Sequence, residues 1–224
     1  IFYLDSGDMV RYDYGGNAHG NFKVYNIAIR GTYAKIFTDR LKVGFTLKYI
    51  REDIWEVYMQ SFALDIGSIF DTGIYGFILG MSVSNFGPEV QFKGPGLEVV
   101  DEDSPTGIYE KKTELFPLPM MFRLGIENQV IGNREDALIK SNTHRFIFAL
   151  DGIKPIDYTV YGSMGLEYAW NEMAFIRCGT HFAHDTAGAS FGFGVRFMGI
   201  KIDYAISDYG ILGSTGQFGI GLEF

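Results

Sequence analysis

Three short stretches of the sequence hold residue types that could carry out chemistry. The first, GASFG from Gly188 to Gly192, matches the G-x-S-x-G pattern of a nucleophilic serine. That pattern works only where the serine lies at a turn between a strand and a helix, whereas Ser190 begins an alternating stretch typical of a strand. We therefore interpret GASFG as a chance match in a glycine-rich strand.

The other two stretches hold metal-ligand residue types. HFAHD places His181, His184 and Asp185 near a predicted turn, but spacing this loose is weak evidence for zinc, and a solvated turn is the favoured interpretation. Around the acidic residues 101–103, no glycine and no glutamate falls at the position where an EF-hand calcium loop needs it, so we interpret this stretch as a solvated loop. The sequence predicts no catalytic residue, no metal, no cofactor and no enzyme activity.

The composition narrows the class of protein. The chain has 224 residues, of which 47% are hydrophobic and 16% aromatic. Glycine accounts for 29 of the 224 residues, a share well above the roughly 7% of ordinary usage. Glycine and aromatic residues together favour strands over helices. The net charge of −8 argues against a nucleic-acid partner, which needs a basic surface. The single Cys178 cannot form an internal disulfide, and no apolar run reaches the roughly 18 residues of a transmembrane helix.

Alternation with a period of two residues dominates the whole chain and predicts an all-β fold. Many of the predicted strands have ten residues or more, whereas globular strands average about five or six and membrane-spanning strands need about 9–11. The twelve predicted strands are 1–12, 22–37, 41–51, 57–70, 74–86, 117–131, 143–151, 159–170, 173–182, 186–197, 200–208 and 214–224. These lengths favour a transmembrane antiparallel β-barrel, one domain over 1–224, rather than a soluble sandwich.

Isolated charges on the polar side of the strands can pair across neighbouring strands. Opposite charges facing one another suit the interior of a narrow barrel, although charge pairs on the surface of a soluble sheet remain the alternative. The predicted lumen pairs are Lys42 with Asp65, Glu167 with Arg177, and Arg196 with Asp203.

The connections alternate between short and long, as in bacterial outer-membrane barrels with short periplasmic turns and longer external loops. With the C-terminus at the periplasmic edge, the very short turns all fall on that side, and only 132–142 is longer than expected there. Aromatic residues at the predicted periplasmic strand ends match an interfacial girdle: Phe37, Phe70, Trp170, Phe197 and Phe224. The sequence predicts a location in the bacterial outer membrane, in contact with lipid and lipopolysaccharide.

The last residues, GQFGIGLEF, form the most regular apolar alternation in the chain. Their apolar members, Phe218, Ile220, Leu222 and Phe224, are expected to face lipid. An apolar comb that ends on an aromatic residue resembles the C-terminal signal by which the outer-membrane assembly machinery recognises barrels.

The segment 88–116 is the longest predicted loop, and loops of this length are usually functional or disordered. Its apolar content argues against simple disorder, so it could fold over the barrel mouth, offer a surface to a partner, or form a passive flap. The candidate partner-binding residues are Val90, Phe92, Leu97, Val99, Val100, Ile108 and Tyr109.

Five stretches together resemble the PorV/PorQ family, which is related to the FadL-type transporters of long-chain fatty acids. They are TDRLKVGFTLKYIRED (38–53), FALDIGSIFDTG (62–73), LGMSVSNFGPEVQFKG (79–94), GLEYAWNEMAFIRCG (165–179) and IDYAISDYGILGSTGQFGIGLEF (202–224). The resemblance implies a fourteen-stranded barrel whose N-terminal plug and two strands are missing here, in keeping with a chain that opens inside an apparent strand. It also implies a role in type IX secretion, with translocon components or cargo C-terminal domains as partners.

Three functions remain open at this point. The chain could bind or shuttle secreted cargo through its external loops, as the resemblance implies. It could transport hydrophobic molecules, because inward glycines leave room inside the barrel. It could also be a structural subunit of an outer-membrane complex.

Overall fold

The computed structural model describes residues 1–100, 108–183, 185–186 and 188–222, and these residues form strands, turns and two short 3-10 segments, Pro95–Leu97 and Gly210–Leu212. Among them there is no helix long and apolar enough to cross a membrane. The acidic run Asp101, Glu102 and Asp103, together with His184 and Phe224, lies outside the described residues.

The long strands agree closely with the sequence prediction. They are β4 (Val24–Ile36), β5 (Leu41–Ile54), β6 (Val57–Asp71), β7 (Phe77–Phe86), β10 (Met121–Gly132), β12 (His144–Pro155), β13 (Tyr161–Trp170), β14 (Ala174–Phe182), β15 (Ala189–Phe197), β16 (Ile200–Asp208) and β17 (Ser214–Leu222). The short strands are β1 (Phe2–Asp5), β2 (Met9–Tyr12), β3 (Ala18–Phe22), β8 (Glu98–Val100), β9 (Ile108–Glu110) and β11 (Ile139–Lys140).

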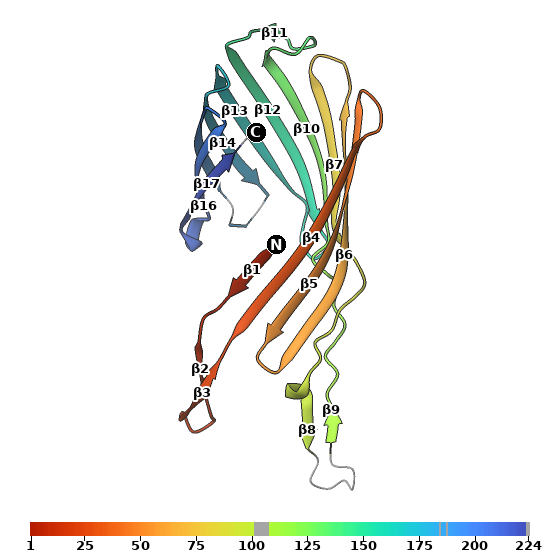
Figure 1. The fold of residues 1–224 in the computed structure, drawn as a ribbon, viewed down its shortest axis with the longest axis vertical. Helices are drawn as coiled ribbons and strands as arrows, with labels where there is room; N and C mark the ends of the chain where they lie inside the picture. Colours follow the sequence, from red (N-terminus) through yellow and green to blue (C-terminus); the bar gives the residue numbers. More distant parts are fainter. Residues whose placement is uncertain (101–107, 184, 187, 223–224) are drawn as a thin grey trace. The chain divides into compact units, whose positions relative to one another are not determined.

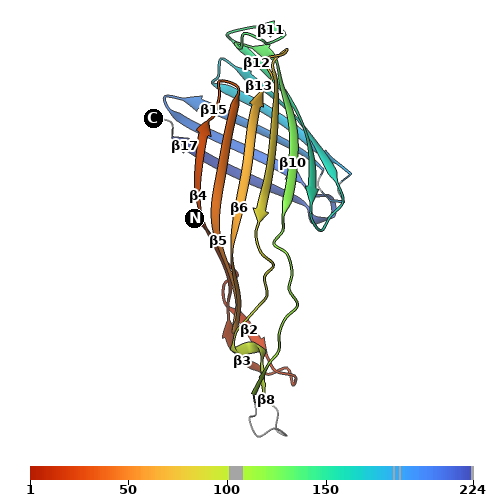
Figure 2. The same ribbon diagram turned by 90° about the vertical axis from the view of Figure 1, so that its right-hand side faces the viewer.

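One large sheet contains thirteen of these strands in the order β1-β4-β5-β6-β7-β10-β12-β13-β14-β15-β16-β17, with β11 beside β10. From β12 to β17 each strand pairs antiparallel with the next, and Figures 1 and 2 show these strands side by side as one curved layer. The predicted all-β antiparallel architecture is confirmed. Two hairpins lie outside the large sheet, β2 with β3 and β8 with β9.

Two predicted strand boundaries are wrong. The predicted strand 1–12 is two short strands, because the chain turns at Gly7, which has φ +71° and donates its N–H to Asp5. The predicted strand 117–131 begins only at Met121, because Pro117 and Pro119 have no N–H to give to a strand ladder.

The short turns follow the predicted positions. Asn171 and Glu172 both have positive φ, as do Met198 and Gly199, which is the geometry of the two-residue type I′ hairpin turn. This turn matches the right-handed twist of the flanking strands and fixes the register on both sides.

The chain divides into two compact units. The first contains Ile1–Tyr33, Gly44–Ile66 and Ser84–Met120, and the second contains Ala34–Val43, Gly67–Val83 and Met121–Phe224. The first unit holds a small apolar core of Met59, Ala63, Val90 and Leu118. The second unit carries mostly small and polar residues on one face of its strands and mostly large apolar residues on the other.

Candidate functional site

Small residues form a continuous row across the inner face of the second unit. The strand register places Ala149, Gly165, Gly179, Ser190, Ser207 and Thr215 side by side from β12 to β17. Because side chains alternate between the two faces of a sheet, the large residues of the same strands lie on the opposite face. The row therefore gives this face a floor made largely of backbone.

A hollow of about 640 Å³ lies above this floor. Ala149, Gly165, Gly179 and Gly219 are among the residues that line it, and Glu167, Arg177 and Asp203 line it as well. A Cβ placed on Gly165 would meet only a backbone oxygen at 3.9 Å, and one on Gly219 would meet nothing within 4 Å. The hollow therefore owes its depth to residues without side chains.

A chain of ion pairs crosses the same face. Arg177 Nε contacts Glu167 Oε2 at 2.5 Å, and Arg177 Nη1 contacts Asp203 Oδ1 at 2.7 Å. Arg145 continues the chain on one side, 2.9 Å from Glu167 and 2.6 Å from Glu172. Lys201 continues it on the other, 3.4 Å from Asp203. We call these six residues the charge ladder, and its three cations and three carboxylates balance.

Gly194 is what lets Arg177 reach Asp203, because β15 lies between their strands. The register places Gly194 directly opposite Asp203. A Cβ on Gly194 would overlap Asp203 Oδ1 and would lie 3.2 Å from Arg177 Nη1. A residue without a side chain at this position is therefore a condition for the ion pair across three strands.

The structure brings together one of the three predicted charge pairs and corrects the other two. Glu167 lies opposite Arg177 and is paired with it, as predicted. Arg196 lies opposite Lys201 rather than Asp203, because the two-residue turn at Met198–Gly199 pairs Phe197 with Ile200.

The third pair involves a different lysine. Asp65 is paired with Lys48, at 2.6 Å, and not with Lys42 as predicted. The reason is the position of the turn, since β5 ends at Ile54 and β6 begins at Val57. Asp65 therefore lies across from residues of β5 that are nearer the turn than Lys42.

Asn85 connects the Lys48–Asp65 pair to the base of the long loop in the first unit. Its backbone N–H donates to Asp65 at 2.8 Å, and its side-chain oxygen accepts from Lys48 at 2.8 Å. Its side-chain nitrogen donates to the carbonyl of Pro119 at 3.0 Å. Asn85 has φ +58°, a left-handed conformation that asparagine tolerates better than most residues. The SNFGP stretch thus forms a junction between both ends of the loop.

The stem of loop 88–116 packs on the β5–β6 hairpin. Val90 is 5% exposed and Leu118 2% exposed, and both belong to one apolar cluster with Met59 and Ala63 of β6. Phe92 stacks on Phe116 with ring centroids 5.8 Å apart. This corrects the expectation that Val90 and Phe92 present a surface to a partner, because apolar side chains at the stem are used to cover the hairpin.

The remaining candidates of this loop lie at its outer part. Leu97 is half-buried, and in the β8–β9 hairpin Val99 pairs with Tyr109 and Val100 with Ile108. Between these strands lie residues 101–107, outside the described part of the chain. The assignment of the hairpin residues to a partner stays a prediction.

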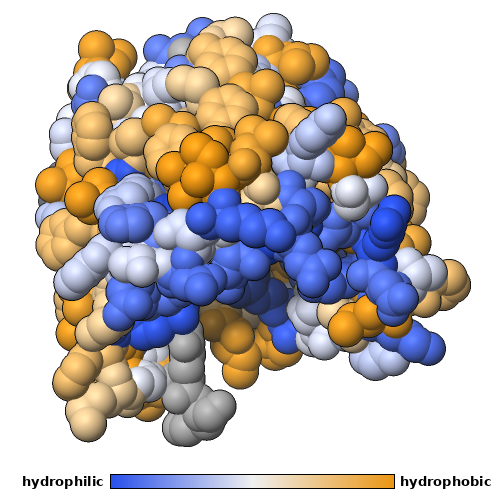
Figure 3. Space-filling model, turned by 90° about the horizontal axis from the view of Figure 1, so that it is seen from above, coloured by the Kyte–Doolittle hydropathy of each residue, from blue (hydrophilic) through white to orange (hydrophobic). Residues whose placement is uncertain are grey.

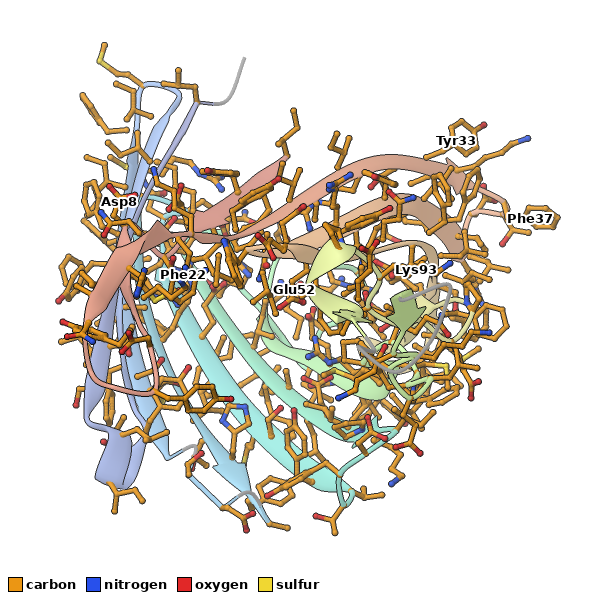
Figure 4. All side chains as sticks on the ribbon, turned by 90° about the horizontal axis from the view of Figure 1, so that it is seen from below. Asp8, Phe22, Tyr33, Phe37, Glu52 and Lys93 are labelled. Atoms are coloured by element: carbon orange, nitrogen blue, oxygen red, sulfur yellow. The ribbon has the colours of Figure 1, made fainter. Side chains whose placement is uncertain are left out.

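Large apolar side chains are exposed on the outer face of the strands. In the view from above, hydrophobic residues border a band of hydrophilic ones (Figure 3). In the last strand Phe218, Ile220 and Leu222 are between 63% and 67% exposed, as the predicted comb requires. The predicted girdle residues Phe37, Phe70, Trp170 and Phe197 are exposed too, and Figure 4 shows Phe37 pointing away from the ribbon. This is the surface that a barrel presents to lipid.

The long connection 132–142 is anchored to the neighbouring turn. Arg134 contacts Asp71 at 2.6 Å and Asp136 at 3.1 Å. The hydrogen bond from Arg134 holds the pKa of Asp136 below its usual range. Ile139 and Lys140 pair parallel with the end of β10. The extra length on this side therefore forms an ordered cap on the strand ends.

The GASFG motif lies within a strand. Ser190 lies inside β15, opposite Gly179 and Ser207, and not at a turn before a helix. In the described part of the chain no group of three or more His, Cys, Asp or Glu residues could hold a metal ion.

Comparisons with known proteins bear on the fold. No family model and no curated protein sequence matches the chain. Among solved structures, the Ralstonia pickettii toluene transporter TbuX matches with a TM-score of 0.55 and 12% identity, over 93% of this chain and 71% of that one. The Pseudomonas putida toluene transporter TodX matches with a TM-score of 0.51 and 11% identity, over 92% and 71%.

These similarities establish the fold alone. The chain shares its fold with these two transporters, in agreement with the predicted all-β fold class of an antiparallel β-barrel. Membership of the PorV/PorQ branch stays a prediction.

Sequence reasoning missed Arg145, Lys201 and Lys48 as members of the charge networks. All three lie on the polar side of their strands, so parity alone could have placed them on the inner face. Sequence could not choose between neighbouring registers, and a shift of two residues changes the partner of every charge.

Proposed function

We propose that the chain is a non-enzymatic outer-membrane β-barrel that takes up small, neutral, hydrophobic molecules through the hollow of its second unit. The observation that carries the proposal is a hollow of about 640 Å³ with a glycine and alanine floor, bordered by charges that neutralise one another. The fold is shared with two proteins that are named toluene transporters.

The charge ladder favours neutral over anionic cargo. Arg177 donates from Nε to Glu167 and from Nη1 to Asp203. An anion drawn to Arg177 would compete with these two carboxylates, and breaking such a pair leaves a charge without its partner. A neutral molecule with a small polar surface loses little by lying on a floor of glycine and alanine.

Uptake by whole cells tests this function. The protein would be produced in the outer membrane of a bacterial host that lacks its own hydrophobic transporters, and entry of radiolabelled toluene would be followed. We expect entry several times faster than in cells without the protein. The double variant Gly165→Leu and Gly219→Leu should remove the gain, because both positions have room for a side chain that fills the hollow.

The matched control is Phe193→Leu on the outer face, which is 56% exposed and should leave uptake unchanged. Barrel assembly of each variant would be checked by its heat-dependent migration in gels. Toluene entry equal to that of empty cells would contradict the proposal, as would full activity of the double variant.

A second candidate function is a PorV-like role in type IX secretion, in which the external loop binds a translocon component or the C-terminal domain of exported cargo. It is favoured by the ordered stem of loop 88–116, in which Val90 pairs with Phe116 and Lys93 pairs with Tyr58 of β6. Leu97 is half-buried and Leu115 is 54% exposed.

Co-purification from a bacterium with this pathway tests the second candidate. The double variant Leu97→Asp and Leu115→Asp should lose secreted cargo or translocon components, whereas Gly165→Leu should retain them. Retention of the partners by the loop variant would contradict this role. If both functions fail, a structural role through the lipid-facing wall is left.

A further inference from the structure

We propose that the outer wall of the second unit carries a binding site for one anionic membrane lipid, formed by a glycine notch for an acyl chain and by Lys154 for the headgroup. The proposal does not depend on transport, because the notch lies on the face opposite to the inner hollow.

The notch is one row of the sheet. The strand register places Leu124, Gly152, Gly162 and Phe182 side by side across β10, β12, β13 and β14. In β12 and β13 the two adjacent glycines interrupt outer-face positions that otherwise carry large side chains, such as Leu150 and Met164. A Cβ on Gly162 would overlap the Phe182 ring, so this ring covers Gly162 and leaves Gly152 open.

The opening above Gly152 is a groove of about 660 Å³. Its walls are apolar and exposed: Leu124 is 63% exposed, Val160 61% and Phe182 48%. Asp151 also borders the groove, but its side chain accepts a hydrogen bond from Ser163 at 3.5 Å on the inner face. Hydrocarbon is therefore the chemistry that fits the groove.

The groove is continuous with the wall that faces lipid. Its residues have the same strand parity as the exposed apolar comb of β12 and β13, which includes Leu150 and Met164. In a bilayer this surface is covered by acyl chains, so the occupant that is always present is lipid. A chain lying in the groove makes contact with backbone as well as with side chains, which an ordinary annular lipid does not.

Lys154 supplies the charge at the end of the groove. It follows Gly152 by two residues and therefore lies on the same face, one step nearer the turn at 156–160. The register places it opposite Phe122. Its Nζ donates to the carbonyl of Tyr158 at 2.6 Å, which fixes the side chain and leaves two further N–H donors.

Lys154 lies at the end of β12, and a lysine at the end of a lipid-facing strand lays its stem along apolar surface and holds its ammonium at the headgroup level. There it attracts anionic lipid over zwitterionic lipid, whereas an apolar notch alone would not distinguish them. The combination of notch and lysine thus predicts selectivity for a negatively charged headgroup.

Fluorescence quenching by brominated lipids tests the site. A reporter variant would carry Val160→Trp at the groove wall in a background of Trp55→Phe and Trp170→Phe, which removes both native tryptophans. The protein would be reconstituted in phosphatidylcholine bilayers that contain brominated phosphatidylglycerol or brominated phosphatidylcholine. We expect the anionic lipid to bind beside this reporter about fivefold more strongly, the factor that one lysine near an anionic surface provides.

Two variants separate the parts of the site. Lys154→Gln keeps a donor for the Tyr158 carbonyl and should bring the preference down to about one. Gly152→Leu fills the groove and should also abolish the preference, and it should fold because a Cβ there meets only a backbone oxygen at 3.9 Å. The control reporter Ile220→Trp, on a wall position that is 66% exposed, should show no preference.

Equal quenching by the two lipids at the Val160→Trp reporter would overturn the proposal. A preference that survives Lys154→Gln would overturn the role of the lysine, and one that survives Gly152→Leu would overturn the role of the notch. A similar preference at the control reporter would mean that anionic lipid gathers around the whole barrel, and the specific site would be rejected.

Discussion

The inner-parity positions are covered in one part of the first unit, whereas those of the second unit border an open hollow. In the first unit, Met59 and Ala63 point to the side that the loop stem covers, and Val90 and Leu118 close over them. In the second unit the equivalent positions are glycine, alanine and charged residues, and the hollow above them stays open. Both follow the same alternation, so the difference comes from what the chain itself places on the inner face. The loop stem covers part of the first unit, and the hollow of the second unit stays open.

We expect the largest change in stability in the apolar cluster of the first unit. Leu118→Ala removes a side chain that is 2% exposed and should lower the free energy of unfolding by about 2–4 kcal/mol, through lost burial and the cavity left behind. Leu115→Ala in the same loop is the matched control, because Leu115 is 54% exposed, and it should change stability little. Urea unfolding of both variants in detergent micelles measures the difference. Equal losses would mean that the stem does not form a core.

In the second unit, the two glycines that lie opposite Asp203 should differ in how much an alanine substitution lowers the stability. Gly194→Ala places a Cβ against Asp203 Oδ1 and should cost about 1–3 kcal/mol by displacing the ion pair with Arg177. Gly219 lies opposite Asp203 on the other side, with nothing within 4 Å of its Cβ direction. Gly219→Ala should therefore change stability by less than about 0.5 kcal/mol. The same unfolding measurement decides, and equal effects would remove the special role of Gly194.

Asn85 tests the junction at the base of the loop. Asn85→Gly keeps the left-handed backbone but loses the bonds to Lys48 and to the Pro119 carbonyl, so it should cost about 1 kcal/mol. Asn85→Ala loses the same bonds and adds strain at φ +58°, for about 1 kcal/mol more. Protease accessibility of loop 88–116 should rise in both variants. If alanine is as stable as glycine, the backbone conformation of Asn85 is not the constraint.

The smallest effect should be the dependence on pH in the cap formed by 132–142. Because Arg134 lowers the pKa of Asp136 from its ordinary 3.8, the pair contributes stability above that value and loses it as the pH falls through the lowered pKa. The difference in melting temperature between the native protein and Arg134→Gln should thus shrink as the pH falls from 7 toward 3. A difference that is constant over this range would contradict the ion pair.

Much of the fold was predictable from the sequence because alternation is a local property. Each residue's parity depends only on its distance along its own strand, so the outer comb of Phe218, Ile220 and Leu222 and the type I′ turn at Asn171–Glu172 follow from neighbouring residues. The predicted strand boundaries were wrong near Pro117, Pro119 and Gly7, where a single proline or glycine decides whether a strand continues.

The sequence by itself determined which residues share a face, and with it the apolar outer wall and the polar inner one. Only the tertiary structure decided which charge meets which, as with Lys48 in place of Lys42 and Lys201 in place of Arg196. It also decided that Val90 turns inward and that Gly152 and Gly162 meet. The physical reason is that such contacts depend on register and on the path of long loops, which are set by packing between segments far apart in the chain.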